Sequence, residues 1–104
     1  MTNIQQIMQM GQQLQARISQ LQESLDQQTV TTSSGGGMVE VTADGKGEVK
    51  RIRIDPACVD PRDVEMLEDL VQAAVNQAQA KARELYEKEM RKATGNLPFP
   101  IPGL

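Results

Sequence analysis

Residues 38–56 read MVEVTADGKGEVKRIRIDP, and this stretch decides the fold. Its first half alternates apolar and polar side chains, as in a strand with one buried face; the apolar ones are Val39, Val41 and Ala43. The pair Asp44-Gly45 then suits a tight hairpin turn, because such turns favour residues that tolerate positive φ. Strand character resumes after the turn and ends before Pro56, which has no N–H for a strand ladder. The stretch predicts antiparallel strands over residues 38–44 and 47–55.

The alternation in the second of these strands is interrupted. Ile52 and Ile54 share one face of the strand, whereas Val49 has the opposite parity. Either Val49 packs on the other face, or a β-bulge lies between it and Ile52. The residues alone leave both alternatives open.

Upstream of the hairpin the sequence predicts another strand and a helix. Residues 29–34 are rich in β-branched side chains, and Gly35-Gly36-Gly37 supplies a turn, so we expect a three-stranded antiparallel β-meander. Residues 3–27 predict an amphipathic helix whose apolar positions recur every three or four residues. This stripe packs either on its own domain or on a helix of another subunit, and Gly11 within it permits close helix approach or a bend.

Downstream, residues 61–94 predict one long helix or a helix pair. Asp60 is expected as its N-cap and Pro61 as its first helical residue. Unbroken, this helix would be about 50 Å long, so part of it should project from so small a domain. The apolar residues of both helical segments predict a dimer or helix seam formed by Ile7, Leu14, Ile18, Leu21, Leu67, Val71, Ala74 and Ala78.

The expected architecture is a single α+β domain over residues 1–96 of the 104-residue chain. Residues 97–104 alternate proline with apolar residues and predict a flexible tail. With one Phe, one Tyr and no Trp, the core lacks the side chains that bury the largest areas. We therefore expect an oligomer, in which a partner covers apolar surface that one chain leaves exposed.

The composition argues against most enzyme classes. The chain has no histidine and a single cysteine, Cys58, so it lacks a histidine base, a Cys–His pair and a zinc cluster. Its glycine-rich turn lacks the residues of a phosphate loop. No signal peptide and no apolar run of about 18 residues is recognised. We expect a cytoplasmic protein with no enzymatic activity, no cofactor, no metal ion, no membrane contact and no small-molecule substrate.

The net charge is −3, but the charges are segregated along the chain. Residues 54–80 contain six acids and one basic residue, Arg62. Further along, Lys81, Lys88 and Lys92 fall within about 40° of one another on a helix, and such a stripe can follow DNA phosphates. The alternative is a solvated face in which two acid–base pairs form at i,i+4 spacing, Glu84 with Lys88 and Glu87 with Arg91.

Several motifs carry a resemblance to a known family: the turn 35–37, the strand 38–42, the corner Ile54-Asp55-Pro56 and the helical run 65–71, EMLEDLV. In order and spacing these resemble the YbaB/EbfC family of bacterial nucleoid-associated proteins. The resemblance implies a YbaB-like homodimer with projecting helical arms. It also implies binding to double-stranded DNA, alteration of DNA conformation, and roles in nucleoid organisation and gene regulation.

The same resemblance assigns DNA contact to the helical arms. In this chain their basic residues are Arg17, Lys81, Arg83, Lys88, Arg91 and Lys92. Lys46, in the hairpin turn, is expected to contribute less. An alternative function is a helical protein-interaction or holdase-type module without direct DNA binding, because Met8 and Met10 give the first helix an adaptable apolar surface.

Overall fold

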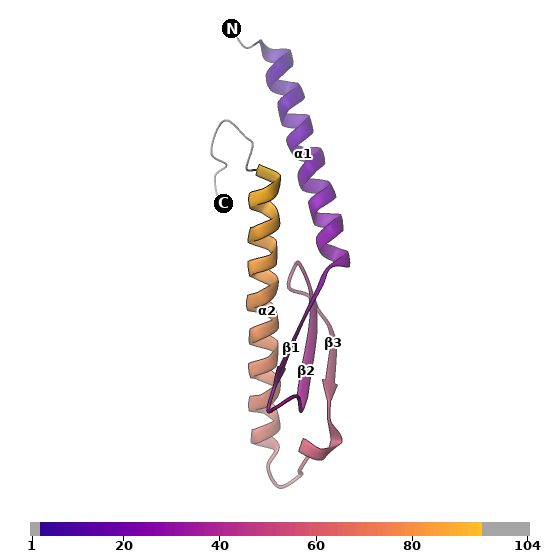
Figure 1. The fold of residues 1–104 in the computed structure, drawn as a ribbon, viewed down its shortest axis with the longest axis vertical. Coiled ribbons are helices and arrows are strands. Elements are labelled where there is room, and N and C mark those ends of the chain that lie inside the picture. The colour runs from indigo at the N-terminus through magenta and orange to yellow at the C-terminus, as the bar shows by residue number, and fades with distance from the viewer. Residues whose placement is uncertain (1–2, 95–104) are drawn as a thin grey trace.

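The computed structural model describes residues 3–94, which form an elongated molecule of 72 × 20 × 16 Å (Figure 1). The elements in chain order are α1 (Ile4–Gln27), β1 (Thr29–Ser34), β2 (Val39–Asp44), β3 (Val49–Ile54), a short 3₁₀ helix η1 (Pro56–Cys58) and α2 (Val64–Thr94). The predicted α+β class and its order of helix, three strands and helix are confirmed. The predicted tail, residues 97–104, lies outside the described residues.

The sheet is an antiparallel meander with the order β1-β2-β3. The pairing of β2 with β3 shifts between Thr42 and Ala43, so that Thr42 pairs with Arg51 and Ala43 with Val49. Lys50 is therefore the extra residue of a β-bulge, one of the two alternatives predicted for this strand. The bulge returns Val49 to the face of the sheet that carries Ile52 and Ile54.

One face of the sheet packs on α2. The apolar side chains of β2 meet two small residues of the helix, and together with Cys58 they form the buried core: Val39, Val41, Ala43, Ala74 and Ala78. Two hydroxyl groups of β1 donate hydrogen bonds to carbonyls of α2, Thr32 to Ala74 at 2.7 Å and Ser34 to Leu70 at 2.6 Å. The helix covers β1 and β2 far more than β3, which leaves Ile52 and Ile54 on the uncovered part of this face, 45% and 38% exposed.

The predicted start of the second helix is wrong by three residues. The Asp60 carboxylate accepts the N–H of Arg62 at 2.9 Å, and this local turn takes the place of a helical turn begun at Pro61. The helix begins instead at Val64, where the Asp63 carboxylate caps it by accepting the N–H of Met66 at 3.1 Å. From there α2 runs unbroken for 31 residues, so it is one helix and not a helix pair.

Both helices project from the same end of the sheet (Figure 1). We call α1 and residues 81–94 of α2 the arms, and the sheet, η1 and residues 64–80 the root. The arms pack together around Leu21, Leu25 and Met90, which are buried. The residues of α1 before Leu14 are all exposed, so the first half of α1 has little cover from the rest of the described chain. None of the helices described is long and apolar enough to cross a membrane.

Candidate nucleic-acid interface

The five basic residues predicted on the second arm are all exposed: Lys81, Arg83, Lys88, Arg91 and Lys92. Among them, within residues 3–94, only Lys92 forms an ion pair, with Glu89 at 3.6 Å. The alternative pairs, Glu84 with Lys88 and Glu87 with Arg91, do not form. Four of the five cations are therefore available to an anionic ligand.

These cations lie on different sides of α2. Lys81, Lys88 and Lys92, which we call the lysine stripe, fall within about 40° of one another along one edge of the apolar face. Arg83 lies on the opposite edge, roughly 160° from Lys81. A single straight contact along α2 therefore cannot include both the lysine stripe and Arg83.

The structure brings Arg17 close to one member of the lysine stripe, Lys92. A groove of about 450 Å³ runs between the two arms, lined by Arg17, Gln20, Leu21, Ser24, Glu89, Lys92 and Ala93. Arg17 enters it from α1 and Lys92 from α2, so two helices contribute a cation to one groove. Glu89 also lines it and lowers the local positive charge through its ion pair with Lys92.

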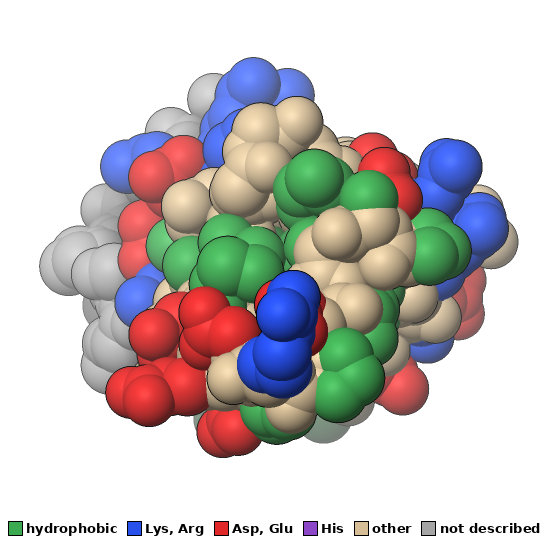
Figure 2. All heavy atoms as spheres, turned by 90° about the horizontal axis from the view of Figure 1, so that it is seen from below, with side chains coloured by type: hydrophobic (Ala, Val, Ile, Leu, Met, Phe, Trp, Pro, Cys, Tyr) green, Lys and Arg blue, Asp and Glu red, His purple; other side chains and the backbone are tan. Residues whose placement is uncertain are grey.

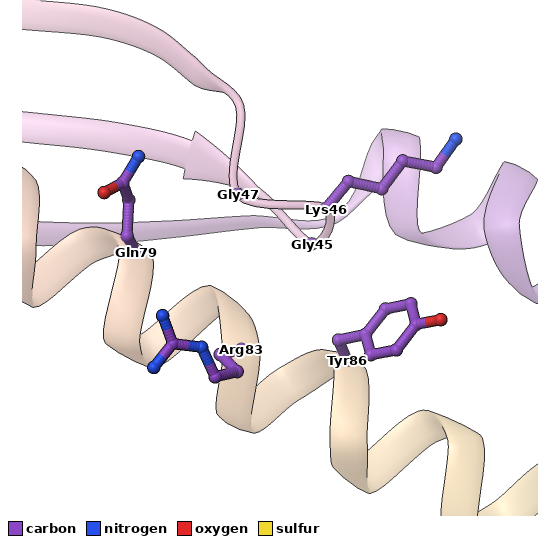
Figure 3. Close-up of a pocket in the computed structure, with 6 residues that line it drawn as sticks. All are labelled: Gly45, Lys46, Gly47, Gln79, Arg83 and Tyr86. Atoms are coloured by element: carbon purple, nitrogen blue, oxygen red, sulfur yellow. The ribbon is translucent and has the colours of Figure 1, made fainter. Parts of the chain in front are cut away.

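Arg83 lines a second hollow, of about 420 Å³, between α2 and the turn that joins β2 to β3 (Figure 3). The other lining residues are Gly45, Lys46, Gly47, Gln79 and Tyr86. The Lys46 ammonium points away from Arg83 toward α1, where it pairs with Asp26 at 3.0 Å. Arg83 is thus the cation of this hollow that no described acid neutralises.

Acidic residues gather at the opposite end of the molecule. Figure 2 views the root end on and shows red side chains crowded on one side, with hydrophobic patches between and beside them. This end carries the acids around the start of α2, namely Asp60, Asp63, Glu65, Glu68 and Asp69, and three exposed apolar residues, Val59, Val64 and Met66. Carboxylates repel phosphates, so the charge distribution favours DNA contact at the arms.

Five of the eight residues of the predicted seam belong to two apolar clusters within the subunit. Leu21 is buried between the arms, and Leu14 and Ile18 are half-buried on α1, whereas Ile7 is 58% exposed. On α2, Ala74 and Ala78 are buried against the sheet, and Leu67 and Val71 pack beside them.

Two arginines that the sequence analysis did not single out lie on the open face of the sheet. Arg51 and Arg53 alternate with Ile52 and Ile54 on β3, so they point away from α2, and both are exposed. Their partners on β2 are Thr42 and Glu40. This face therefore carries two positive charges, and Glu40 lies directly opposite one of them, Arg53.

The described residues contain no cluster of three His, Cys, Asp or Glu side chains that could hold a metal ion. Cys58 is buried, and its thiol donates a hydrogen bond to the carbonyl of Asp55 at 3.1 Å. Its position is that of a packed residue of the core.

Comparison with known proteins places these features in context. Residues 1–97 match the YbaB/EbfC DNA-binding family. A nucleoid-associated protein of Moorella thermoacetica is 53% identical over 82% of either chain, and one of Rhodospirillum rubrum is 46% identical over all of this chain and 96% of its own. The crystal structure of an uncharacterized protein from Helicobacter pylori superposes with a TM-score of 0.80 at 25% identity, covering 88% of this chain and 97% of that one.

Proposed function

The chain belongs to the YbaB/EbfC DNA-binding family, and from this we propose that it binds double-stranded DNA as a homodimer and alters its conformation. Such a protein acts in nucleoid organisation and gene regulation in the cytoplasm and has no enzymatic activity. The observation that supports this most directly is the distribution of charge: five exposed basic residues on the second arm, four of them without an ion pair in the described chain, and a cluster of acids at the opposite end.

The contacts we propose are to the phosphate backbone. Lysine and arginine side chains that neutralise phosphates release condensed counterions, which drives binding regardless of base sequence. The lysine stripe supplies point charges of this kind along one edge of the arm. Arg17 extends the contact to α1, since it shares a groove with Lys92.

The homodimer is supported by the apolar surface that one subunit leaves uncovered. Ile52 and Ile54 lie on the face of the sheet that packs against α2, but on β3, the strand that α2 covers least. Val59, Val64 and Met66 add exposed apolar surface at the root. A second copy seated here would bury these side chains and leave both pairs of arms free to contact one duplex. Two fixed sets of cations would then impose their spacing on the DNA, which is how protein contacts deform a duplex.

A salt titration tests the DNA contact. If each subunit places about three cations near phosphates, a dimer releases about six counterions, and log affinity falls against log salt with a slope of roughly −5. The measurement is fluorescence anisotropy of a random-sequence duplex across about 50 to 200 mM salt. Analytical ultracentrifugation in the same buffers gives the mass of the assembled protein. A slope near zero, or a monomer throughout, would contradict the proposal.

A second candidate function is the helical protein-interaction or holdase-type module. It is favoured by the exposed apolar residues of the first arm, Ile4, Ile7, Met8 and Met10. Binding of an apolar partner to this surface depends little on salt, because no counterions are released. Strong capture of an unfolded client in a protein that shows no affinity for duplex DNA would favour this alternative.

A further inference from the structure

The turn between β2 and β3 caps the end of the α1 arm. The N–H of Gly45 donates to two carbonyls there, those of Leu25 at 2.9 Å and Gln28 at 3.1 Å. The last carbonyls of a helix have no partner within it, so such a donor stabilises the helix end. An added Cβ on Gly45 would lie 2.5 Å from Leu25 Cδ2 and 3.0 Å from Leu25 O, and therefore only glycine fits this contact.

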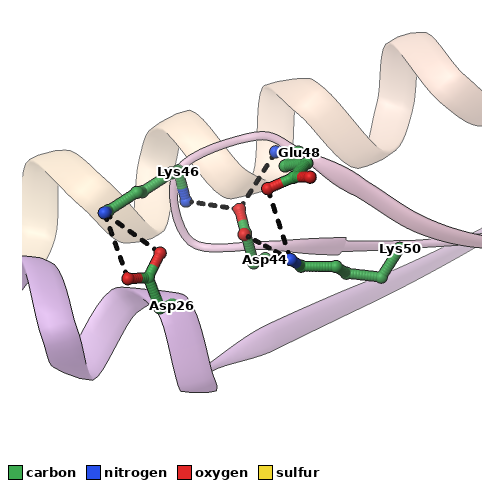
Figure 4. A network of polar contacts seen from close by, with 5 residues as sticks. All are labelled: Asp26, Asp44, Lys46, Glu48 and Lys50. Atoms are coloured by element: carbon green, nitrogen blue, oxygen red, sulfur yellow. Dashed lines mark hydrogen bonds and ion pairs between the residues drawn. The ribbon is translucent and has the colours of Figure 1, made fainter.

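The turn is held in shape by a buried carboxylate (Figure 4). One oxygen of Asp44, which has no exposed surface, accepts the N–H groups of Lys46 at 2.9 Å and Glu48 at 3.0 Å. Lys50 lies 3.5 Å from the other oxygen and also bonds Glu48 at 3.2 Å. Burial raises the pKa of Asp44, but the two backbone hydrogen bonds and Lys50 outweigh it and leave the pKa below its ordinary value.

A second tie joins the turn to α1. The ammonium group of Lys46 reaches both carboxylate oxygens of Asp26, at 3.0 and 3.1 Å (Figure 4). Both side chains are about half exposed, so the pair adds less than the Gly45 contact. It joins Asp26, in the last turn of α1, to the same turn that Gly45 connects to Leu25.

This contact lies at the base of the α1 arm, so a small change of angle there moves the far end of the arm by a larger distance. From Leu25 to Ile4 the helix extends about 30 Å, and all of its residues before Leu14 are exposed. A tilt of about 10° at the turn would move the tip of the arm by roughly 5 Å over that length.

We propose that residues 44–48, with Gly45 at their centre, are a clamp that sets the direction of the α1 arm and thereby the shape imposed on bound DNA. Gly45, Asp44 and Lys46 are positioning residues in this role, since they act through α1 and not through a DNA contact of their own. The part that concerns DNA rests on the proposed function.

Gly45→Ala tests the clamp directly. Spin labels at residues 8 and 76, in full-length Cys58→Ala protein diluted with unlabelled subunits, report the distance between arm tip and root. We expect a shift of about 5 Å or a matching broadening, and a changed bend in an end-labelled duplex at saturating protein. Val39→Ala is the control, because it removes buried apolar contacts of the root at the end of β2 that lies away from the turn. Equal distances and equal bends in the two variants, at similar loss of thermal stability, would overturn the clamp.

Lys46→Asp is a milder variant, useful if Gly45→Ala does not fold. It places a second carboxylate opposite Asp26, and the further change Asp26→Lys restores an ion pair of reversed sense. We expect the label distance to broaden in the single variant and to recover in the double variant. An unchanged distance in Lys46→Asp would reject the clamp. If the label distance changes in these variants but the unmutated protein binds no DNA, the clamp is retained and the proposed function is rejected.

Discussion

The root and the arms share one helix, α2, but they use it differently. In the root, Ala74 and Ala78 lie against the strands with no exposed surface, and two strand hydroxyls bond to the helix carbonyls. In the arms, a small cluster around Leu25 and Met90 is the buried contact, and the first half of α1 lies beyond it. The buried contacts that stabilise the fold are therefore concentrated in the root, which carries the acidic cluster. The basic residues lie on the arms, where few side chains are buried. Folding and DNA binding should be separable by mutation.

An aspartate introduced into the root and another introduced into the α1 arm should have very different effects on stability. Val41→Asp puts an unpaired charge into the fully buried core and should cost about 3–5 kcal/mol or more, a large fraction of the stability of a small domain. Ile7→Asp, on the exposed arm, should change the free energy of unfolding by no more than about 0.5 kcal/mol. Urea denaturation followed by circular dichroism measures both. A comparable loss from Ile7→Asp would show that the assembled protein covers this arm.

Reversing charge should break binding without breaking the fold. Lys88→Glu with Lys92→Glu removes about four phosphate contacts from a dimer, so the slope of log affinity against log salt should become shallower by roughly 3–4. Helicity should remain, since both side chains are exposed. The matched control is Arg51→Glu with Arg53→Glu, the same change of charge on the open face of the sheet. Equal loss of binding in the control would move the DNA contact from the arms to the sheet.

The carboxylate of Asp44 should make the clamp sensitive to acid. Because the pKa of Asp44 is lowered in the folded protein, its stabilising effect is present above about pH 4 and lost as the pH falls through the lowered value. Asp44→Asn should cost about 1–3 kcal/mol at pH 7, and progressively less in stronger acid. Thermal unfolding between pH 7 and pH 2.5 measures this. Glu23→Gln, which also removes one carboxylate but at an exposed site on α1, is the matched control.

The smallest expected effect is on the unsupported arm. Gly11 has nothing within 4 Å of the place where a Cβ would be, so Gly11→Ala should stabilise the local helix by roughly 1 kcal/mol. Amide exchange in the first half of α1 should slow by about fivefold, while the global melting temperature stays the same. Slower exchange accompanied by weaker dimerisation would instead show that a second helix approaches Gly11 closely.

The secondary structure could be predicted from the sequence because its signals are local. Alternation in residues 38–44 and the Asp-Gly turn identified the hairpin, and the bulge at Lys50 was one of two alternatives that parity allowed. The start of α2 could not be predicted, because Asp60 and Asp63 are both good caps. The choice between them depends on the turn that Asp60 forms with Arg62.

The site was predicted less well, since it depends on which side chains meet in space. The lysine stripe followed from helical spacing alone. The role of Lys46 did not: from the sequence it was expected only to contribute less to DNA contact than the basic residues of the arms. In the structure it pairs with Asp26, 20 positions earlier in the chain, and it lines the same hollow as Arg83 of α2. Reversing the charge of Lys46 would therefore also break its ion pair with Asp26 of α1.

The two hydroxyl bonds from β1 give α2 a defined phase. Thr32 and Ser34 bond carbonyls four residues apart on the helix, so they oppose both sliding and rotation of α2 on the sheet. Because an α-helix turns by ~100° per residue, this contact fixes the angular position of every later residue of α2. The direction of the lysine stripe is therefore set by the position of Ala74 on the sheet. One residue inserted between positions 79 and 80 would leave the root intact and turn the stripe away by ~100°. Seven inserted residues would nearly restore its direction and carry it outward by ~10 Å. Insertions of about two helical turns therefore lengthen this arm and keep the direction of the lysine stripe, whereas a single inserted residue changes that direction.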